Sequence, residues 1–414
     1  MMKGLLLGIL IFNCDYLYGQ NSQAPDINSI IRISDFDKLP VVHWKFKTNS
    51  PLFSSPTISE NVVFVGSLDS TLYALDLGTG KLKWKFKTGG QIRSTASVQG
   101  DQLFLYSGDA ILYCFSKTSG KVLWSFKTRG GILGDRLYDF ADYFQSSPVY
   151  HNKRIFFGAG DGHVYAIDAS SGKLSWSFKA GEIVHTTPAL YKDRLFIGSF
   201  DGNLYALKQE DGDLLWKFKT VGHRYFPTGE VQGNPVVKND MVYFGARDYN
   251  FYAIDVFGGY CHWNKSFPFG WAMAAMPDDS AVYLGTSDDR ILLALDSKTG
   301  RELWRTDVKF NIFGSPMKSA SMVYAGTLMG KMYGIDRKNG DIKWVFTTEG
   351  YNSNHLKYFK SDDTFRDDIS NLIKTPADFI GMEYKLGGIF STPAITDAFM
   401  VVSSTDGNIY CLKR

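Results

Sequence analysis

Long blocks of like charge and long hydrophobic runs are both lacking in this sequence, and each absence excludes a class of protein. The 45 basic and 42 acidic residues are interspersed and leave a net charge of +3. Because no basic run is present, we expect no nucleic-acid partner. The apolar run at the N-terminus, from Gly4 to Phe12, is too short to cross a bilayer.

That N-terminal run instead has the layout of an export signal. Lys3 precedes it and polar residues follow it in MMKGLLLGILIFNCDYLYGQ, which predicts a signal peptide over residues 1–19 with cleavage after Gly19. Cys14 leaves a second interpretation open, a lipoprotein signal in which this cysteine is acylated. Such signals have a small residue before the cysteine, where Asn13 stands here. Soluble export is therefore favoured, and we expect membrane contact only if Cys14 is lipidated.

The sequence contains an internal repeat with constant spacing. A small residue lies in the middle of segments such as LYALD, and these residues are Ala74, Cys114, Ala166, Ala206, Ala253, Ala294, Gly334 and Cys411. Six residues after each of the first seven comes a glycine, namely Gly80, Gly120, Gly172, Gly212, Gly259, Gly300 and Gly340. Ten residues after each of the first seven comes a tryptophan, namely Trp84, Trp124, Trp176, Trp216, Trp263, Trp304 and Trp344.

Each repeat predicts four short antiparallel strands. Segments such as VVFVGS and LYALD are strand-like, and a DG pair between them predicts a tight hairpin turn. In WKFKT the Trp and Phe share one face, whereas the lysines point outward and discourage edge-to-edge pairing. Four strands in about 40 residues is the arrangement of a propeller blade. The predicted fold class is therefore all-β, an eight-bladed propeller of four-stranded antiparallel blades.

The two ends of the chain are predicted to share the last blade. The eighth repeat stops at Arg414 before any Trp, whereas VVHWKFKT, from Val41 to Thr48, has no LYALD segment before it. We predict that this N-terminal strand pairs with the last repeat, with Trp44 as the eighth docking tryptophan. The expected organisation is a linker over 20–40 and a propeller over 41–414, with a helical loop insertion at about 349–388.

The cysteines are few and none is adjacent to another. If the signal is removed, Cys114, Cys261 and Cys411 remain, and an odd number in an exported protein can include a reactive thiol. Cys114 and Cys411 hold the position that alanine takes in most repeats, so we expect both to be small buried packing residues. The pattern gives no role to Cys261.

The pattern A-x-D-x-x-x-G-x-x-x-W, as in ALDLGTGKLKW, resembles the tryptophan-docking repeat of the pyrroloquinoline quinone (PQQ) propellers and covers nearly all of residues 41–414. One branch of these propellers holds the quinoprotein dehydrogenases. Many of those have adjacent cysteines over the quinone and a Ca²⁺ near it. The other branch is non-catalytic and related to the outer-membrane assembly factor BamB.

The resemblance implies the non-catalytic branch. This chain has no adjacent cysteines, only Trp271 lies outside the docking set, and no compact carboxylate cluster of the sort Ca²⁺ prefers is present. We expect a scaffold without enzymatic activity or cofactor, in the periplasm or at the outer-membrane periphery, as a monomer or part of a larger complex. Its expected partner is a protein or peptide of the cell envelope. The alternative is a small quinoprotein dehydrogenase or sensor that binds PQQ or another flat ligand in the channel mouth.

Insertions fall into one class of loop, which connects the outer strand of one blade to the inner strand of the next. They occupy 129–148, 221–235 and about 349–388, and loops on a rigid scaffold commonly carry binding. In the longest insertion, DTFRDDISNLIK places Phe365, Ile369, Leu372 and Ile373 on one helical face. TPADF then predicts a helix start, with a Thr cap, Pro at the first helical position and Asp378 two residues later. We predict two short helices over the mouth near blades 7, 8 and 1.

A proline stands eighteen residues before the small residue in six repeats, at Pro56, Pro148, Pro188, Pro235, Pro316 and Pro393. The residue three before this proline, or its equivalent in the other blades, predicts a two-sided cup at the mouth. Blades 1 to 8 give Phe53, Arg93, Gln145, His185, Gln232, Ala272 (beside Trp271), Phe313 and Phe390. The polar members belong to blades 2 to 5 and the apolar ones to the other blades. Arg224, Tyr225 and Glu230 are expected to flank the polar half. An amphipathic peptide could bind there, with carboxylate or backbone groups on Arg93 and His185.

A structural alternative stays open, in which Phe53, Phe313 and Phe390 form only the floor beneath a fixed lid. No Ser, His and Asp can be joined by spacing and no carboxylates are paired, so the residues give no support to nucleophilic or hydrolytic catalysis.

Overall fold

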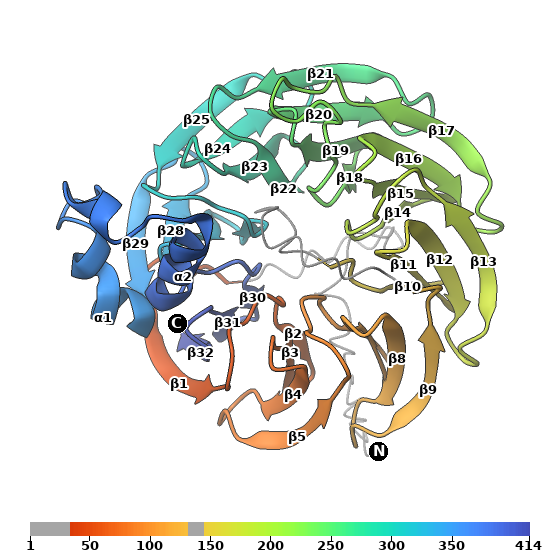
Figure 1. The fold of residues 1–414 in the computed structure, drawn as a ribbon, viewed down its shortest axis with the longest axis horizontal. Coiled ribbons are helices and arrows are strands. Elements are labelled where there is room, and N and C mark those ends of the chain that lie inside the picture. The colour runs from red at the N-terminus through yellow and green to blue at the C-terminus, as the bar shows by residue number, and fades with distance from the viewer. Residues whose placement is uncertain (1–33, 131–144) are drawn as a thin grey trace, which may run out of the picture.

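Eight four-stranded antiparallel sheets surround a central channel in the computed structural model (Figure 1). The structure describes residues 34–130 and 145–414. The predicted signal peptide with Cys14, the linker up to residue 33, and most of the 129–148 insertion lie outside these residues. Within the described part, none of the helices is long and apolar enough to cross a membrane. The predicted fold class is confirmed.

The blades follow one another along the chain, and each runs from an inner strand at the channel to an outer strand at the rim (Figure 1). Blades 1 and 2 contain β2 (Thr57–Ser59), β3 (Val62–Gly66), β4 (Thr71–Asp76), β5 (Leu82–Lys87), β6 (Ser97–Gln99), β7 (Gln102–Tyr106), β8 (Ile111–Ser116) and β9 (Val122–Lys127). Blades 3 and 4 contain β10 (Val149–His151), β11 (Arg154–Gly158), β12 (His163–Asp168), β13 (Leu174–Lys179), β14 (Ala189–Tyr191), β15 (Arg194–Gly198), β16 (Asn203–Lys208) and β17 (Leu214–Lys219).

The second half of the ring repeats this order. Blades 5 and 6 contain β18 (Val236–Lys238), β19 (Met241–Ala246), β20 (Asn250–Asp255), β21 (Cys261–Ser266), β22 (Ala272–Pro277), β23 (Ala281–Thr286), β24 (Ile291–Asp296) and β25 (Glu302–Asp307). Blades 7 and 8 contain β26 (Met317–Lys318), β27 (Met322–Gly326), β28 (Lys331–Asp336), β29 (Ile342–Thr347), β30 (Ala394–Ile395), β31 (Phe399–Ser403), β32 (Asn408–Lys413) and β1 (Val41–Lys47).

The N-terminal strand completes blade 8, as predicted. β1 pairs antiparallel with β32, and Trp44 lies opposite Cys411. The same register recurs in the other blades, for example Ala74 opposite Trp84 in blade 1. A β-bulge follows the small residue in these blades, which explains the constant spacing of ten residues to the tryptophan.

Each docking tryptophan joins its blade to the next one. The indole N–H of Trp84 donates to the carbonyl of Lys117 at 3.0 Å, and that of Trp44 donates to the carbonyl of Leu77 at 2.7 Å. The ring lies on the repeat glycine of the next blade. At Gly120, which has a φ of +69°, an added Cβ would lie 2.6 Å from Cδ2 of Trp84. A side chain at this position would therefore displace the indole, and its positive φ also favours glycine.

Trp344 docks differently, because blade 8 has no turn between its third and outer strands. Its indole N–H donates to the carbonyl of Phe36 at 2.6 Å, and the backbone N–H of Phe36 donates to the hydroxyl of Tyr324 at 2.7 Å. Phe36 is fully buried in a cluster built from blades 7 and 8. The sequence analysis gave no role to this residue. Residues just before β1 thus take the place of the missing turn.

The hydrophobic core lies between neighbouring blades. One cluster combines Phe156 and Trp176 of blade 3 with Leu195 and Tyr205 of blade 4. The small-residue position belongs to these interfaces, and both Cys114 and Cys411 are fully buried there, which confirms their predicted packing role. Burial raises the pKa of each thiol to about 12. Cys261 begins β21 at an exposed position, and its Sγ lies 3.2 Å from the carbonyl oxygen of Trp263.

The aspartates of the hairpin turns have structural contacts. In blade 2 a carboxylate oxygen of Asp109 accepts a hydrogen bond from the hydroxyl of Tyr113 at 2.8 Å and from the backbone N–H of Gly89 at 2.7 Å. Five other blades have the same Asp–Tyr pair, formed by Asp69–Tyr73, Asp161–Tyr165, Asp201–Tyr205, Asp248–Tyr252 and Asp406–Tyr410. Each carboxylate thus ties its own hairpin together, and that of Asp109 also fastens the hairpin to the loop that leaves the outer strand of blade 1.

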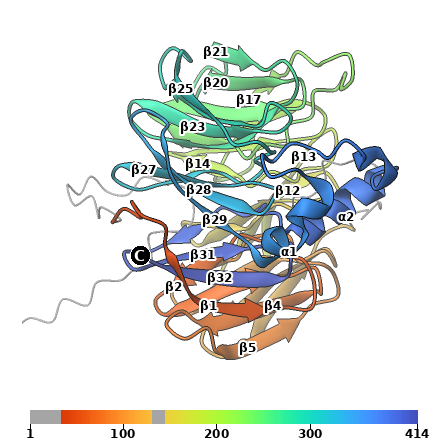
Figure 2. The same cartoon turned by 90° about the vertical axis from the view of Figure 1, so that its left-hand side faces the viewer.

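The long insertion forms two helices on one face of the disc, beside blades 7 and 8 (Figure 2). Helix α2 (Pro376–Leu386) begins as predicted, with Thr375 as cap and Asp378 completing a capping box. Helix α1 (Glu349–Tyr358) lies before the DTFRDDISNLIK segment, which was predicted to be helical and contains only the short 3₁₀ helix η1 (Ile369–Asn371). The position predicted for the first helix is therefore wrong.

Local side-chain contacts explain why this segment does not form the predicted helix. The side chain of Asp362 accepts from the backbone N–H of Thr364 at 3.0 Å, and Arg366 pairs with Asp368 at 2.8 Å. Such short-range bonds compete with helical ones. The apolar side chains still pack, as the rings of Phe359 and Phe365 stack 4.6 Å apart.

Candidate binding site at the channel mouth

The apolar half of the predicted cup is covered by α2. Phe53, Phe313 and Phe390 are 6%, 8% and 3% exposed, and they share a cluster with Met382 and Leu386 of the helix. The ring centroid of Phe53 lies 5.7 Å from that of Tyr384 and 4.4 Å from that of Phe390. These three phenylalanines form the floor beneath the insertion, which is the structural alternative that the sequence left open.

The insertion is fastened to blades 7 and 8 by polar contacts. The hydroxyl of Ser404 donates to the carbonyl of Gly387 at 2.8 Å, and that of Thr405 donates to the carbonyl of Glu383 at 3.1 Å. On blade 7, Lys331 forms an ion pair with Asp363, which also accepts a hydrogen bond from Tyr351 of α1 at 2.9 Å. The helices therefore form a docked lid over one half of the mouth.

Glu383 is buried in this lid, but its carboxyl group takes part in none of these polar contacts. It is 2% exposed, and no ion pair or hydrogen bond joins its carboxyl group to another described residue. Burial, followed by the nearby carboxylate of Asp288, raises the pKa of Glu383 well above the ordinary value of 4.5. The neutral acid is thus the form that the folded lid accommodates.

We expect Glu383→Gln to raise the stability of the protein above pH 5. In the unfolded chain Glu383 ionises near its ordinary pKa, but in the folded chain it stays protonated to a higher pH. Wild-type stability therefore falls as the pH rises from about 4.5 towards the raised pKa, at about 1.4 kcal/mol for each unit of pKa difference. Thermal midpoints of both proteins between pH 4 and pH 8 measure this difference.

Glu210→Gln is the matched control, because Glu210 is exposed. Its thermal midpoints are expected to follow those of the wild type. A Glu383→Gln protein whose midpoint stays at the wild-type value throughout that pH range would contradict the account of the buried acid.

The polar half of the cup lines a pocket in the channel, and we call this part of the channel the neck. Arg93, Gln145 and Gln232 line it together with the three floor phenylalanines. The side-chain oxygen of Gln145 accepts from the backbone N–H of both Arg93 and Ser94 at 3.3 Å. The guanidinium carbon of Arg93 lies 6.0 Å from the ring centroid of Phe53, where the two halves meet.

The remaining predicted residues lie around this pocket rather than in its lining. His185 packs its ring edge against Phe200, with centroids 5.6 Å apart. Arg224 and Tyr225 project from the loop after β17, and Arg224 covers the ring of Tyr225, which is 62% exposed. Glu230, on the same loop, accepts a backbone hydrogen bond from Arg247 at 2.9 Å. Arg224 and Tyr225 thus form an exposed rim beside the polar half.

Trp271 is enclosed by its neighbours. Its indole is 8% exposed and lies parallel to the ring of Tyr249, with centroids 6.0 Å apart. Phe226 contacts it edge-on at 5.6 Å, and the guanidinium carbon of Arg247 lies 5.4 Å from its centroid. These contacts do not fit the indole as a stacking platform for a flat ring cofactor.

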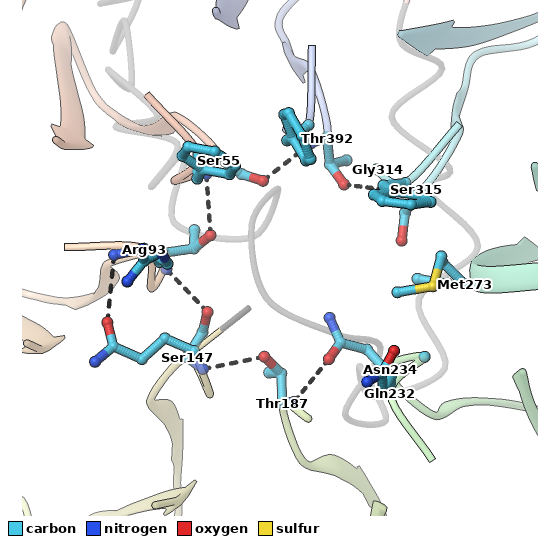
Figure 3. Close-up of a pocket in the computed structure, with 17 residues that line it drawn as sticks. Ser55, Arg93, Ser147, Thr187, Gln232, Asn234, Met273, Gly314, Ser315 and Thr392 are labelled. Atoms are coloured by element: carbon cyan, nitrogen blue, oxygen red, sulfur yellow. Dashed lines mark hydrogen bonds between the residues drawn. The ribbon is translucent and has the colours of Figure 1, made fainter. Parts of the chain in front are cut away.

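An open ring of hydrogen bonds that sequence reasoning missed runs around the neck of the channel from blade 7 through blades 8 and 1 to blade 5 (Figure 3). Successive blades donate a backbone N–H to a side-chain oxygen of the next blade. The bonds are Ser55 to Thr95 at 3.3 Å, Thr95 to Ser147 at 2.9 Å, Ser147 to Thr187 at 3.1 Å, Thr187 to Asn234 at 2.8 Å, Ser315 to Thr392 at 3.1 Å and Thr392 to Ser55 at 3.0 Å.

The signal for this ring was present in the sequence. A Ser, Thr or Asn directly precedes most of the repeat prolines, as at Ser147 before Pro148 and Asn234 before Pro235. In blade 6 there is no such proline, and Met273 and Ala274 take the place at the pocket. These residues stand two positions after those from which the cup was predicted.

Comparisons with known proteins agree with this architecture. The family described as outer membrane protein assembly factor BamB matches residues 41–94, 87–301 and 262–362. The outer membrane protein assembly factor BamB of Salmonella typhimurium is 23% identical over 186 residues, which are 45% of this chain and 38% of that protein.

Solved structures share the fold at low sequence identity. The crystal structure of BamB from Moraxella catarrhalis has a TM-score of 0.67 and 14% identity, with 91% of this chain and 100% of that chain covered. The quinohemoprotein alcohol dehydrogenase of Comamonas testosteroni has a TM-score of 0.68 and 12% identity, with 93% and 78% covered. These likenesses concern the fold alone, since binding and catalytic proteins share it.

Proposed function

This chain belongs to the family of the outer membrane protein assembly factor BamB, and from that premise we propose that it is a non-catalytic binding scaffold of the cell envelope. Its partner would be a protein or peptide bound at the channel mouth, and by family likeness that partner would take part in outer-membrane protein assembly. The predicted export signal supports a place in the periplasm or at the outer-membrane periphery.

The exposed rim carries this proposal. Tyr225 and Arg224 are exposed and belong to the same class of loop as the lid, and the neighbouring Phe226 packs against the cluster that contains Met382 and Leu386 of α2. Tyrosine and arginine are the residue types that most often dominate the energy of protein interfaces. Among the described residues, α2 covers the apolar half, whereas Arg224 and Tyr225 are exposed. A rigid closed ring holds both in place at little entropic cost to binding.

A photo-crosslinking amino acid at Tyr225 tests the proposal in intact cell envelopes. We expect discrete protein adducts from this position and none of them from Leu82, an exposed residue of the outer strand β5. In the purified protein, combining Arg224→Ala with Tyr225→Ala should weaken binding of the cross-linked partner about tenfold or more, as expected for interface hot spots. The thermal midpoint should stay unchanged. Identical adducts from both positions would contradict a mouth-face partner.

The alternative function, a PQQ-binding dehydrogenase or sensor, is tested separately. The enclosed indole of Trp271 does not fit a stacked quinone, and the described residues hold no group of three or more metal-ligating side chains. Absorbance of the purified protein after addition of PQQ and Ca²⁺ decides the matter. A stoichiometric quinone spectrum with dye-linked alcohol oxidation would overturn the scaffold proposal.

A further inference from the structure

The hydroxyl groups at the channel neck have protons to donate. The side-chain oxygens of Thr95, Ser147 and Thr187 each accept a backbone N–H from the preceding blade, and Ser55 and Thr392 do the same. A hydroxyl that accepts one bond still carries its own proton as a donor. Within the described residues, none of these five hydroxyls donates that proton to a protein acceptor. Within the described part of the chain, these protons are therefore available to a group that enters the channel.

Two further polar side chains face the same pocket. The Nε of Arg93 is buried without a hydrogen-bond partner, and so are both the nitrogen and the oxygen of the Gln232 amide, on a side chain that is 3% exposed. A buried polar group without a partner is costly, and such groups mark places where a ligand or ordered water completes the bonding. Among the described residues that line the pocket, Arg93 is the only charged one. The pocket thus combines a positive charge with an excess of donors.

We propose that the channel neck is a carboxylate-binding site, which takes one carboxylate of an extended peptide segment and so deepens the proposed partner-binding function on which it rests. A carboxylate is an acceptor-only group with about four lone-pair positions. It therefore matches several hydroxyl donors at once, and a guanidinium adds a charge-assisted bond. The amide of Gln232 offers N–H donors and a carbonyl acceptor, which suit the carbonyl and N–H of the adjoining peptide bond.

The arrangement of the ring suits a small group rather than a bulky one. The hydroxyl residues of blades 1, 3, 4 and 8 follow one another around the pocket (Figure 3), and Thr95 of blade 2 also lines it, whereas blade 6 contributes the methyl group of Ala274 and the thioether of Met273. The polar and apolar parts of the neck thus lie on different sides. A carboxylate would lie on the side of Arg93, and the aliphatic part of its residue would lie toward blade 6.

Calorimetric titration of the full chain with matched peptides tests the site. The probes are N-acetyl-triglycine, its C-terminal amide, N-acetyl-Gly-Asp-Gly-amide and inorganic phosphate. We expect the free acid to bind and its amide to bind at least about tenfold more weakly, since a charge-assisted bond is lost. Binding of the Asp peptide would show that side-chain carboxylates are accepted, and its failure would restrict the site to chain termini. Equal affinity for acid and amide, no binding of any peptide, or a preference for phosphate would overturn the proposal.

Three variants separate recognition from folding. Arg93→Gln and Gln232→Leu leave the interblade ring intact, and each should weaken binding of N-acetyl-triglycine, Arg93→Gln by about tenfold. Thr79→Val removes a hydroxyl from a distant outer turn, where it bonds to Asp76, and should bind as the wild type does. Unchanged affinity in Arg93→Gln would refute the site. If Arg93→Gln protein still forms the adducts at Tyr225, the scaffold proposal survives the failure of the neck site.

Discussion

A chain that starts at Asn49, and so lacks β1, should fail to form a stable propeller. Blade 8 would lose its outer strand, and blade 1 would lose the indole of Trp44, which bonds to Leu77 and covers Gly80. Removing a large packed aromatic side chain costs about 3–5 kcal/mol, and whole proteins are stable by only about 5–15 kcal/mol. Thermal melting followed by far-ultraviolet circular dichroism measures the loss.

Two longer chains serve as controls for this truncation. A chain that starts at Ser34 keeps every closure contact found among the described residues and should melt with the intact protein. A chain that starts at Val41 keeps β1 but loses Phe36, so that the indole of Trp344 lacks its acceptor and a fully buried ring is missing. We expect an intermediate melting temperature for it. If the Asn49 chain melted with the intact protein, closure by β1 would have no role in stability.

Gly120→Ala should destabilise the protein far more than Gly100→Ala. Both glycines belong to blade 2 and have positive φ, +69° and +57°, so alanine at either costs about 1–2 kcal/mol in backbone conformation. The new Cβ at Gly100 meets nothing within 4 Å, whereas the one at Gly120 would lie 2.6 Å from the ring of Trp84. Overpacking adds about 1–3 kcal/mol.

The comparison isolates the docking contact from the backbone effect. Denaturant midpoints of the two variants should differ by the overpacking cost, and fluorescence of the tryptophans should change only in Gly120→Ala. A second substitution, Trp84→Ala, removes the ring and should abolish the difference between alanine at 120 and at 100. Equal midpoints for the two glycine variants would refute the role assigned to the repeat glycines.

The regular parts of this fold were predictable because they repeat and because their determinants are short-range. The spacing from the small residue to the tryptophan reflects a hairpin and a bulge, and both are encoded within about a dozen residues. The N-terminal WKFK segment was recognisable because the last repeat, at the other end of the chain, lacks the tryptophan strand that this segment supplies. The start of α2 was predictable for the same reason, as the Thr375 cap and Asp378 lie within one helical turn.

The positions that sequence reasoning missed depend on distant contacts. Helix α1 has a mostly polar sequence, and distant residues hold it, as where the hydroxyl of Tyr410 accepts from the backbone N–H of Glu349 at 2.9 Å. Phe36 gains its role only because Tyr324 and Trp344 lie beside it. Such partners are about 60 to 310 residues away in the chain. No local pattern could reveal them.

In the candidate site, too, some features follow from local sequence and others from contacts between distant residues. Sequence alone determined that a closed ring forms, since blade order follows from the repeat, and it predicted a division between polar residues of blades 2 to 5 and apolar residues of the other blades. Only the tertiary structure decided that α2 covers Phe53, Phe313 and Phe390, that His185 packs against Phe200, and that the hydroxyls before the prolines form the neck. These outcomes depend on which blades and loops become neighbours when the ring closes, and that proximity is a property of the folded chain.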